Sequence, residues 1–161
     1  MDLQLKDKVV IVTGGARGIG GGISESLAAE GAKLVIPSRP SAATEKFVAK
    51  LQQTNEVLYI PCDLTTPGIC KSIIEQSVEK FGALDVLINN AGINDGCNIS
   101  DSLEKFQQSL SNNLIHVFEL VHFAQPHLEK SQGNIINIGS KVAETGQGNA
   151  TGYAAAKGAI N

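Results

Sequence analysis

Short apolar runs alternate along this chain with longer segments in which apolar positions recur about every three or four residues. The short runs are rich in Val, Ile and Leu and stop at glycine or polar residues, which predicts buried strands. They lie at residues 8–13, 33–36, 57–60, 84–88 and 134–138. The longer segments predict helices, the fourth with a break or bend around 111–112. They lie at residues 19–30, 42–53, 67–81, 100–128 and 152–161.

This alternation predicts right-handed crossovers between parallel strands, with helices on both faces of one sheet. The expected fold class is therefore α/β: a Rossmann-type doubly wound parallel sheet in a three-layer α/β/α arrangement. Residues 1–161 are expected to form a single domain. Because the sequence stops inside a helix that such a fold normally covers with another strand, we expect the domain to lack its last strands. Ligands of this architecture bind at the carboxyl ends of the strands.

The charge and composition of the chain give no indication of binding to nucleic acid, a membrane or a metal ion. The chain has 161 residues and a formal net charge of −3, with 13 basic side chains that form no stripe, so nothing favours nucleic acid or an anionic membrane. Apolar runs stay well short of the roughly 18 to 20 residues of a membrane-spanning helix, and the N-terminus does not resemble a signal peptide. Three cysteines and the histidines His116, His122 and His127 form no metal-binding pattern, and His116 and His127 are interpreted as ordinary polar or interface residues. We expect a cytoplasmic protein with free thiols and no metal.

A glycine-rich turn joins the first predicted strand to the first predicted helix, at residues 13–20. Gly14 suits a tight turn, Gly18 lets the backbone approach a pyrophosphate, and Gly20 permits close packing of helix and strand. The N–H groups at the helix start attract anions. An ordinary turn also collects glycine, but the position between strand and helix favours dinucleotide binding.

The end of the second strand selects between the two nicotinamide dinucleotides. NAD-binding folds carry an acidic residue there for the ribose 2′-hydroxyl, whereas this chain has Ser38 followed by Arg39. A guanidinium is suited to a 2′-phosphate, so we predict NADP in preference to NAD. The alternative is that Arg39 is merely a solvated surface residue.

Tyr153 and Lys157 are four residues apart on a predicted helix, which brings their side chains onto one face. A nearby ammonium stabilises tyrosinate and lowers the pKa of the phenol, as a general base acting on an alcohol requires. By itself such a pair is common and usually a surface contact. The residues around it make it informative.

Taken together, the chain resembles the short-chain dehydrogenase/reductase family over its whole length. The motifs occur in the family's order and at its spacings, including thirteen residues from the serine to the tyrosine. They are residues 13–20, 63–64, 89–92, 113–114, Ser140 and 153–157.

The resemblance implies an NAD(P)-dependent oxidoreductase that transfers a hydride between the nicotinamide and an alcohol or carbonyl substrate. Tyr153 would be the acid/base, and Lys157 would lower its pKa and bind the nicotinamide ribose. Ser140 would hydrogen-bond the reacting oxygen. Asn113 would help hold a water that links Lys157 to solvent.

The resemblance also implies the cofactor contacts. Asp63 and Leu64 would meet the adenine, and residues 90–92 would line the adenosine ribose. The full expected set is Thr13, Gly14, Arg17, Gly18, Ile19, Gly20, Ser38, Arg39, Asp63, Leu64, Asn90, Ala91, Gly92, Tyr153 and Lys157. A homotetramer built through the long helix and the Tyr153 helix is implied as well.

Within the family, residues 89–96, 113–116 and 140–149 resemble the L-fucose dehydrogenases of bacteria, which oxidise the anomeric hydroxyl of a sugar to a lactone. The expected substrate is an L-fucose-like aldose. A sugar site needs several fixed polar groups, and the candidates, each also interpretable as a solvated loop residue, are Asn94, Asp95, Lys141 and Gln147. The alternative function is an inactive truncated fragment that at most binds nucleotide or a partner subunit.

Overall fold

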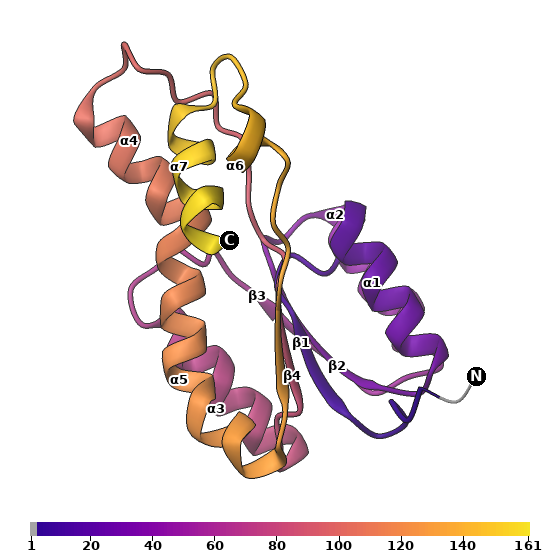
Figure 1. The fold of residues 1–161 in the computed structure, drawn as a ribbon. Helices are drawn as coiled ribbons and strands as arrows, with labels where there is room; N and C mark the ends of the chain where they lie inside the picture. Colours follow the sequence, from indigo (N-terminus) through magenta and orange to yellow (C-terminus); the bar gives the residue numbers. More distant parts are fainter. Residues whose placement is uncertain (1–2) are drawn as a thin grey trace.

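A five-stranded parallel sheet lies between two layers of helices in the structure, a computed structural model that describes residues 3–161 (Figure 1). The strands lie in the order β3-β2-β1-β4-β5, which confirms the expected Rossmann-type α/β fold. Residues 1–2 of the predicted domain lie outside the described residues. In chain order the elements are β1 Val9–Val12, α1 Gly18–Ala29, β2 Lys33–Ser38, α2 Ala42–Leu51, β3 Val57–Pro61, α3 Ile69–Phe81, β4 Val86–Asn89, α4 Leu103–Leu110, the π-helical segment η1 Ser111–Ile115, α5 His116–Ser131, β5 Asn134–Asn137, α6 Val142–Thr145 and α7 Thr151–Ile160.

Strand β1 shows why a continuous apolar run predicts a central strand. Val9 and Ile11 pack into the core shared with α3 and α5, whereas Val10 and Val12 pack into the core shared with α1 and α2. Successive side chains of a strand point to opposite faces, so a strand covered on both faces must be apolar throughout. The sheet has two cores, one on each side.

The chain leaves neighbouring strands β1 and β4 in opposite directions. After β1 it forms α1 on one face, and after β4 it reaches α4 and α5 on the other (Figure 1). In open α/β sheets this divergence leaves a crevice at the carboxyl ends of the two strands. The functional site is therefore expected above β1 and β4.

The long helix expected at 100–128 is interrupted where the sequence predicted a break. Its two α-helical parts, α4 and α5, are joined by the π-helical segment η1. A π-helical turn holds one residue more than an α-helical turn, and such turns are frequent at functional sites. No helix in residues 3–161 has the length and apolar character that crossing a membrane demands.

Several boundaries differ from the prediction, and two of them have a clear structural reason. Strand β2 runs to Ser38 rather than 36, because Pro37 keeps its place in the parallel pairing with β3. Helix α3 begins at 69 rather than 67, after Gly68 in a left-handed conformation with φ 78°. The short helix α6 was not expected from the sequence.

Strand β5 forms one edge of the sheet. It pairs with β4, and no second partner occurs among the described residues. Ile135 and Ile136 are 42% and 46% exposed, in contrast to the buried strand β1.

Helix α7, which carries Tyr153 and Lys157, packs against α4 at Gly152. A Cβ on Gly152 would lie 2.5 Å from both Cβ and Oγ of Ser109. We expect Gly152→Ala to destabilise the protein by about 1–3 kcal/mol, because the added methyl overpacks the contact. Thermal and urea unfolding measure this.

Gly158→Ala is the matched control, because a Cβ at this position of the same helix meets open space among the described atoms. Alanine stabilises a helix interior by about 1 kcal/mol relative to glycine. Equal effects of the two substitutions would contradict the close contact between α7 and α4.

Candidate active site

A cleft of about 990 Å³ opens at the carboxyl ends of the strands, where the fold predicts it. This volume is at the upper end of the range for small-molecule sites. The expected site residues that line it are Gly14, Arg17, Gly18, Ile19, Gly20, Ser38, Arg39, Asp63, Leu64, Asn90, Ala91, Gly92, Ser140, Tyr153 and Lys157. The predicted glycine-rich turn and the predicted Tyr–Lys pair thus face the same space.

The glycine-rich turn leaves its outer side open to a ligand. Gly14 and Gly18 have φ of 62° and 53°, a conformation that favours glycine. A Cβ on Gly20 would collide with Nδ2 of Asn90 and the carbonyl of Gly14. The first turn of α1 has no acidic residue, and its N-cap, Arg17, makes no side-chain cap, so its N–H groups are available to an anion.

Thr13 lies behind the cleft wall instead of on it. Its hydroxyl accepts hydrogen bonds from the backbone N–H groups of Asn90 and Ala91, both at 2.9 Å, and donates to the carbonyl of Ile88 at 3.3 Å. The side chain of Asn90 donates to the Thr13 carbonyl at 2.8 Å. Thr13 is fully buried, so its expected cofactor contact is replaced by a link between the ends of β1 and β4.

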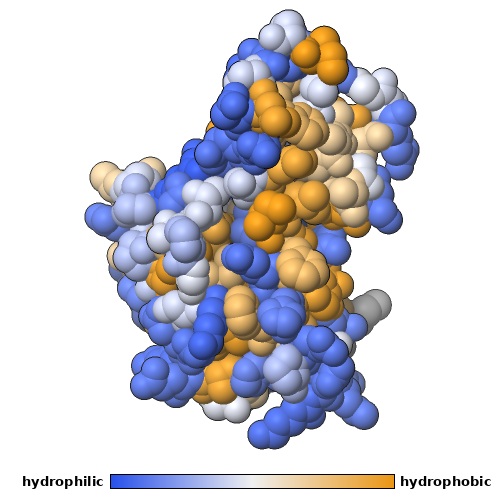
Figure 2. All heavy atoms as spheres, turned by 90° about the vertical axis from the view of Figure 1, so that its left-hand side faces the viewer, coloured by the Kyte–Doolittle hydropathy of each residue, from blue (hydrophilic) through white to orange (hydrophobic). Residues whose placement is uncertain are grey.

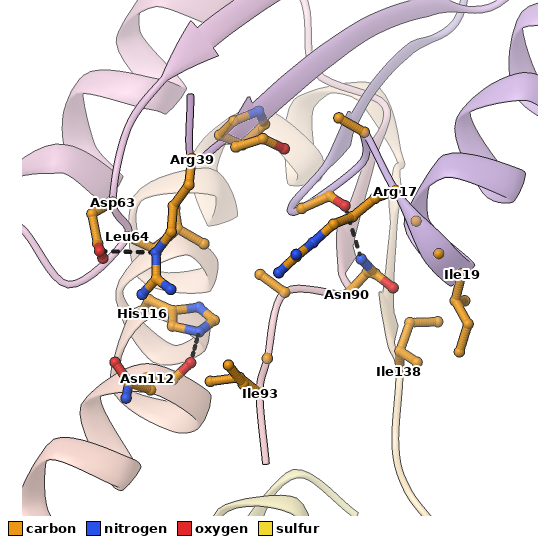
Figure 3. A pocket seen from close by; sticks show the side chains of 18 of the residues that line it. Arg17, Ile19, Arg39, Asp63, Leu64, Asn90, Ile93, Asn112, His116 and Ile138 are labelled. Carbon is orange, nitrogen blue, oxygen red and sulfur yellow. Dashed lines mark hydrogen bonds and ion pairs between the residues drawn. The ribbon is translucent and has the colours of Figure 1, made fainter. Parts of the chain in front are cut away.

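Arg39 reaches from the end of β2 to the loop after β3, as Figure 3 shows. Its Nε donates to Oδ2 of Asp63 at 2.9 Å, which leaves the two terminal guanidinium nitrogens for other partners. The pKa of Asp63 is lowered mainly by the hydrogen bond from the backbone N–H of Thr65, with help from the Thr65 hydroxyl and from Arg39 against the opposing effect of burial. Ser38 directly precedes Arg39 at the end of β2, and its Oγ is buried without a hydrogen-bond partner among residues 3–161.

Lys157 is only 3% exposed, and its ammonium is fixed by the end of β5. Nζ donates to the carbonyl of Ile138 at 2.6 Å and lies 5.9 Å from the centre of the Tyr153 ring. Burial lowers the pKa of Lys157, because the charged form loses hydration. Ser140 faces the same part of the cleft, and its Oγ accepts from the backbone N–H of Val142 at 3.3 Å. A phenol, a hydroxyl and a cation therefore line one wall.

Asn113 is fully buried behind this wall, and both ends of its amide are engaged by protein. Nδ2 donates to the carbonyl of Ser109 at 2.9 Å, and Oδ1 accepts from the N–H of Ile93 at 2.7 Å. The side chain therefore joins the π-helical segment to the loop after β4. The expected water link from Asn113 to Lys157 stays a prediction, because each end of the amide can make one more hydrogen bond.

The four expected sugar contacts lie outside the described cleft wall. Asp95 uses its carboxylate within the protein: it accepts from Oγ of Ser109 at 2.9 Å and from Nδ2 of Asn112 at 3.2 Å. Its place beside α4 supplies these partners, which the sequence does not reveal. The other three are exposed; they are Asn94, Lys141 and Gln147.

His116 lines the cleft although the sequence assigned it no role. It follows Asn113 by three residues, a spacing that places both on one side of a helix. That spacing was the available signal. Its imidazole is 2% exposed.

A model of the short chain dehydrogenase family matches residues 8–161. The chain belongs to this family. The match extends from β1 to the end of the chain, so it includes every element that lines the cleft.

Several members of the family with known names or structures are similar to the chain. L-fucose dehydrogenase of Rattus norvegicus is 40% identical over 95% of this chain and 56% of its own length. The 3-oxoacyl-[acyl-carrier-protein] reductase FabG of Escherichia coli K12 is 33% identical over 98% of this chain and 65% of its own length. The crystal structure of Cj0485 dehydrogenase superposes with a TM-score of 0.91 at 38% identity, covering 99% of this chain and 62% of that one. The chain thus spans about 56–65% of the length of these relatives.

The link made by Thr13 is testable with two substitutions. Thr13→Val keeps the shape but removes the acceptor for two backbone N–H groups, so we expect a loss of about 1–3 kcal/mol in unfolding free energy. Dinucleotide affinity should fall as well, because the glycine-rich turn loses its anchor. Chemical denaturation and ligand titration measure the two effects.

Thr13→Ser is the matched control, because it retains the hydroxyl. It should keep most of the stability and affinity. If the valine variant equals the wild type in both, the hydroxyl does not hold the strand ends.

Proposed function

We propose that this chain forms the dinucleotide-binding and catalytic part of an NAD(P)-dependent oxidoreductase. It would transfer a hydride between a nicotinamide cofactor and an alcohol or carbonyl substrate. The observation that carries the proposal is the shared cleft, which the glycine-rich turn enters from one side and Tyr153, Lys157 and Ser140 from the other. Membership of the short chain dehydrogenase family supports the same reaction class.

The cleft residues fit a nicotinamide dinucleotide. Gly18 and the uncapped start of α1 suit a pyrophosphate, since backbone N–H groups there are free to donate. Asp63 and Leu64 would hold the adenine, and Lys157 the nicotinamide ribose. When bound, such a cofactor supplies the acceptor or donor of the hydride.

The protein's own residues would manage the proton. In oxidation, the Tyr153 oxygen takes the proton from the substrate hydroxyl as the hydride leaves the adjacent carbon, so that a carbonyl forms. Ser140 would donate a hydrogen bond to that oxygen. The buried Lys157 ammonium stabilises the phenolate by its charge, an effect that is stronger where water is excluded.

An L-fucose-like aldose, oxidised at its anomeric carbon to a lactone, is the proposed substrate. The similarity to a protein named L-fucose dehydrogenase supports this class. Asn94, Asp95, Lys141 and Gln147 stay candidates for its hydroxyls, and Lys141 directly follows Ser140.

NADP is the proposed cofactor in preference to NAD. Arg39 lines the cleft at the end of β2, with two nitrogens not used by Asp63. The neighbouring hydroxyl of Ser38, which has no hydrogen-bond partner in the part of the chain that the structure describes, is a further donor. A 2′-phosphate would satisfy both groups.

The proposed partner is a second copy of the chain, in a homotetramer built through the long helix (α4, η1 and α5) and the Tyr153 helix, α7. The outward face of the long helix exposes large apolar side chains; Figure 2 shows this side, where apolar surface is interspersed with polar surface. Leu103, Ile115 and Phe118 are 65%, 48% and 71% exposed. Apolar surface of this kind favours association.

Replacing Tyr153 by Phe tests the proposed reaction. We expect turnover of L-fucose to fall by about 10²–10⁴-fold, the contribution of a positioned acid/base, while dinucleotide affinity changes little. Cofactor reduction with a panel of aldoses, run beside fluorescence titration of the cofactor, separates the two. Retention of most turnover would exclude Tyr153 as the acid/base, and a panel without any oxidised 6-deoxy sugar would exclude the proposed substrate.

Replacing Arg39 by Ala tests the cofactor choice. We expect the KM for NADP to rise about 10- to 100-fold, as for loss of charge-assisted hydrogen bonds to a phosphate, with a much smaller change for NAD. Steady-state kinetics with both cofactors measure the ratio. A wild type that prefers NAD, with a preference that Arg39→Ala leaves unchanged, contradicts the proposal.

A further inference from the structure

His116 has a buried imidazole, one nitrogen of which makes no hydrogen bond within residues 3–161. His116 is the first residue of α5, directly after the π-helical segment, and it is only 2% exposed. Nε2 lies 3.0 Å from the backbone carbonyl of Asn112. Nδ1 is buried and has no hydrogen-bond partner in the described part of the chain. Buried polar atoms are rarely left without a partner.

The contact with Asn112 settles which nitrogen carries the proton. A carbonyl oxygen can only accept a hydrogen bond, so Nε2 must be the donor. Burial, and to a smaller extent the charge of Lys157, lowers the pKa of His116, which keeps the ring neutral near pH 7. Nδ1 is therefore a lone-pair acceptor, and what it lacks is an N–H or O–H donor.

The imidazole lines the cleft on the side of strands β2 and β3. Figure 3 shows it between Asn112 on one side and the Arg39–Asp63 pair on the other, with Leu64 beside that pair. These strands are at the opposite end of the sheet from β5, after which Ser140 and the Tyr153 helix follow. A donor that reaches Nδ1 from the cleft would belong to the half of the ligand that is remote from the reacting carbon.

We propose that His116 binds the adenosine half of the dinucleotide, with Nδ1 accepting a hydrogen bond from an N–H or O–H of that half. The inference rests on the proposed function, because it requires a dinucleotide in the cleft. Adenosine offers two such donors, the adenine amino group and the ribose hydroxyls. The rigid setting of the ring, held by Asn112 and by burial, means that the acceptor is already oriented before the ligand arrives.

Two substitutions separate the nitrogens. In His116→Gln the amide reaches the position of Nε2 and keeps the donor to Asn112, but nothing replaces Nδ1. In His116→Asn the shorter amide places an oxygen near the position of Nδ1. His122→Gln is the control, because His122 is an exposed histidine on the same helix.

The probes are NADP, NAD, 5′-AMP and nicotinamide mononucleotide, which lacks adenosine, titrated by calorimetry. We expect His116→Gln to weaken binding of the three adenosine-containing probes about tenfold, or roughly 1.4 kcal/mol, and to leave nicotinamide mononucleotide unchanged. His116→Asn should recover a large part of the loss, and His122→Gln should match the wild type. Equal affinity of His116→Gln and the wild type for all probes overturns the inference.

An analogue and a spectroscopic signal complete the test. With a dinucleotide that carries hypoxanthine in place of adenine, disappearance of the His116→Gln effect identifies the amino group as donor, and its persistence identifies the ribose. In the ¹⁵N-labelled wild type, the Nδ1 resonance of His116 should move upfield on addition of NADP and not of nicotinamide mononucleotide. This readout needs no substitution, so it decides the question even if a variant fails to fold; an unmoved resonance in the saturated complex overturns the inference. If the wild type binds no dinucleotide at all, the proposed function itself fails.

Discussion

The cleft depends on one hydroxyl, that of Thr13, which joins the ends of two parallel strands whose chains then separate. Asn90 and Ala91 follow the end of β4, and the hydroxyl oxygen of Thr13 accepts a hydrogen bond from the backbone N–H group of each. Asn90 in turn donates to the Thr13 carbonyl and occupies the space against Gly20. The glycine-rich turn, the end of β4 and the start of α1 therefore form one rigid unit. Rigidity of this kind reduces the ordering that a bound phosphate has to impose.

The opposite wall is fixed by a different interaction. The ammonium of Lys157 donates to the carbonyl of Ile138, which ties α7 to the end of β5. Gly92 leaves room for this arrangement, because a Cβ there would lie 3.0 Å from Oδ1 of Asn113 and 3.7 Å from Nζ of Lys157. Burying a cation is unfavourable unless it finds hydrogen-bond partners. The position of Lys157 is thus set by backbone geometry before any substrate binds.

Much of the fold and of the cleft was predictable from the sequence, because their signals are local. A strand covered on both faces is a continuous apolar run, as in β1, and a turn with positive φ selects glycine, as at Gly14 and Gly18. Tyr153 and Lys157 share a helix face for the same reason.

What could not be predicted depends on partners distant in the chain. Thr13 forms hydrogen bonds with residues that lie 77 and 78 positions away, and Asn113 forms one with a residue that lies 20 positions away. A sequence pattern names such polar residues but does not tell whether they face a ligand or one another. Asp95 is an example, because its contacts with Ser109 and Asn112 in the structure could not be read from the sequence. His116 was overlooked because its spacing of three residues from Asn113 indicates a shared helix side but not that this side faces a ligand.

The π-helical segment Ser111–Ile115 determines how much variation in length this region tolerates. Each residue of an α-helix turns the chain by about 100°, whereas a π-helical turn spreads one extra residue over nearly the same rotation. Removing one residue within this segment would therefore restore a regular helix and leave Leu120 and Ala124 buried against the sheet, with Phe118 on the outer surface. Removing one residue from α4 or α5 would instead turn the two parts of the long helix relative to each other, so that one of them would lose its contacts with the core or the cleft.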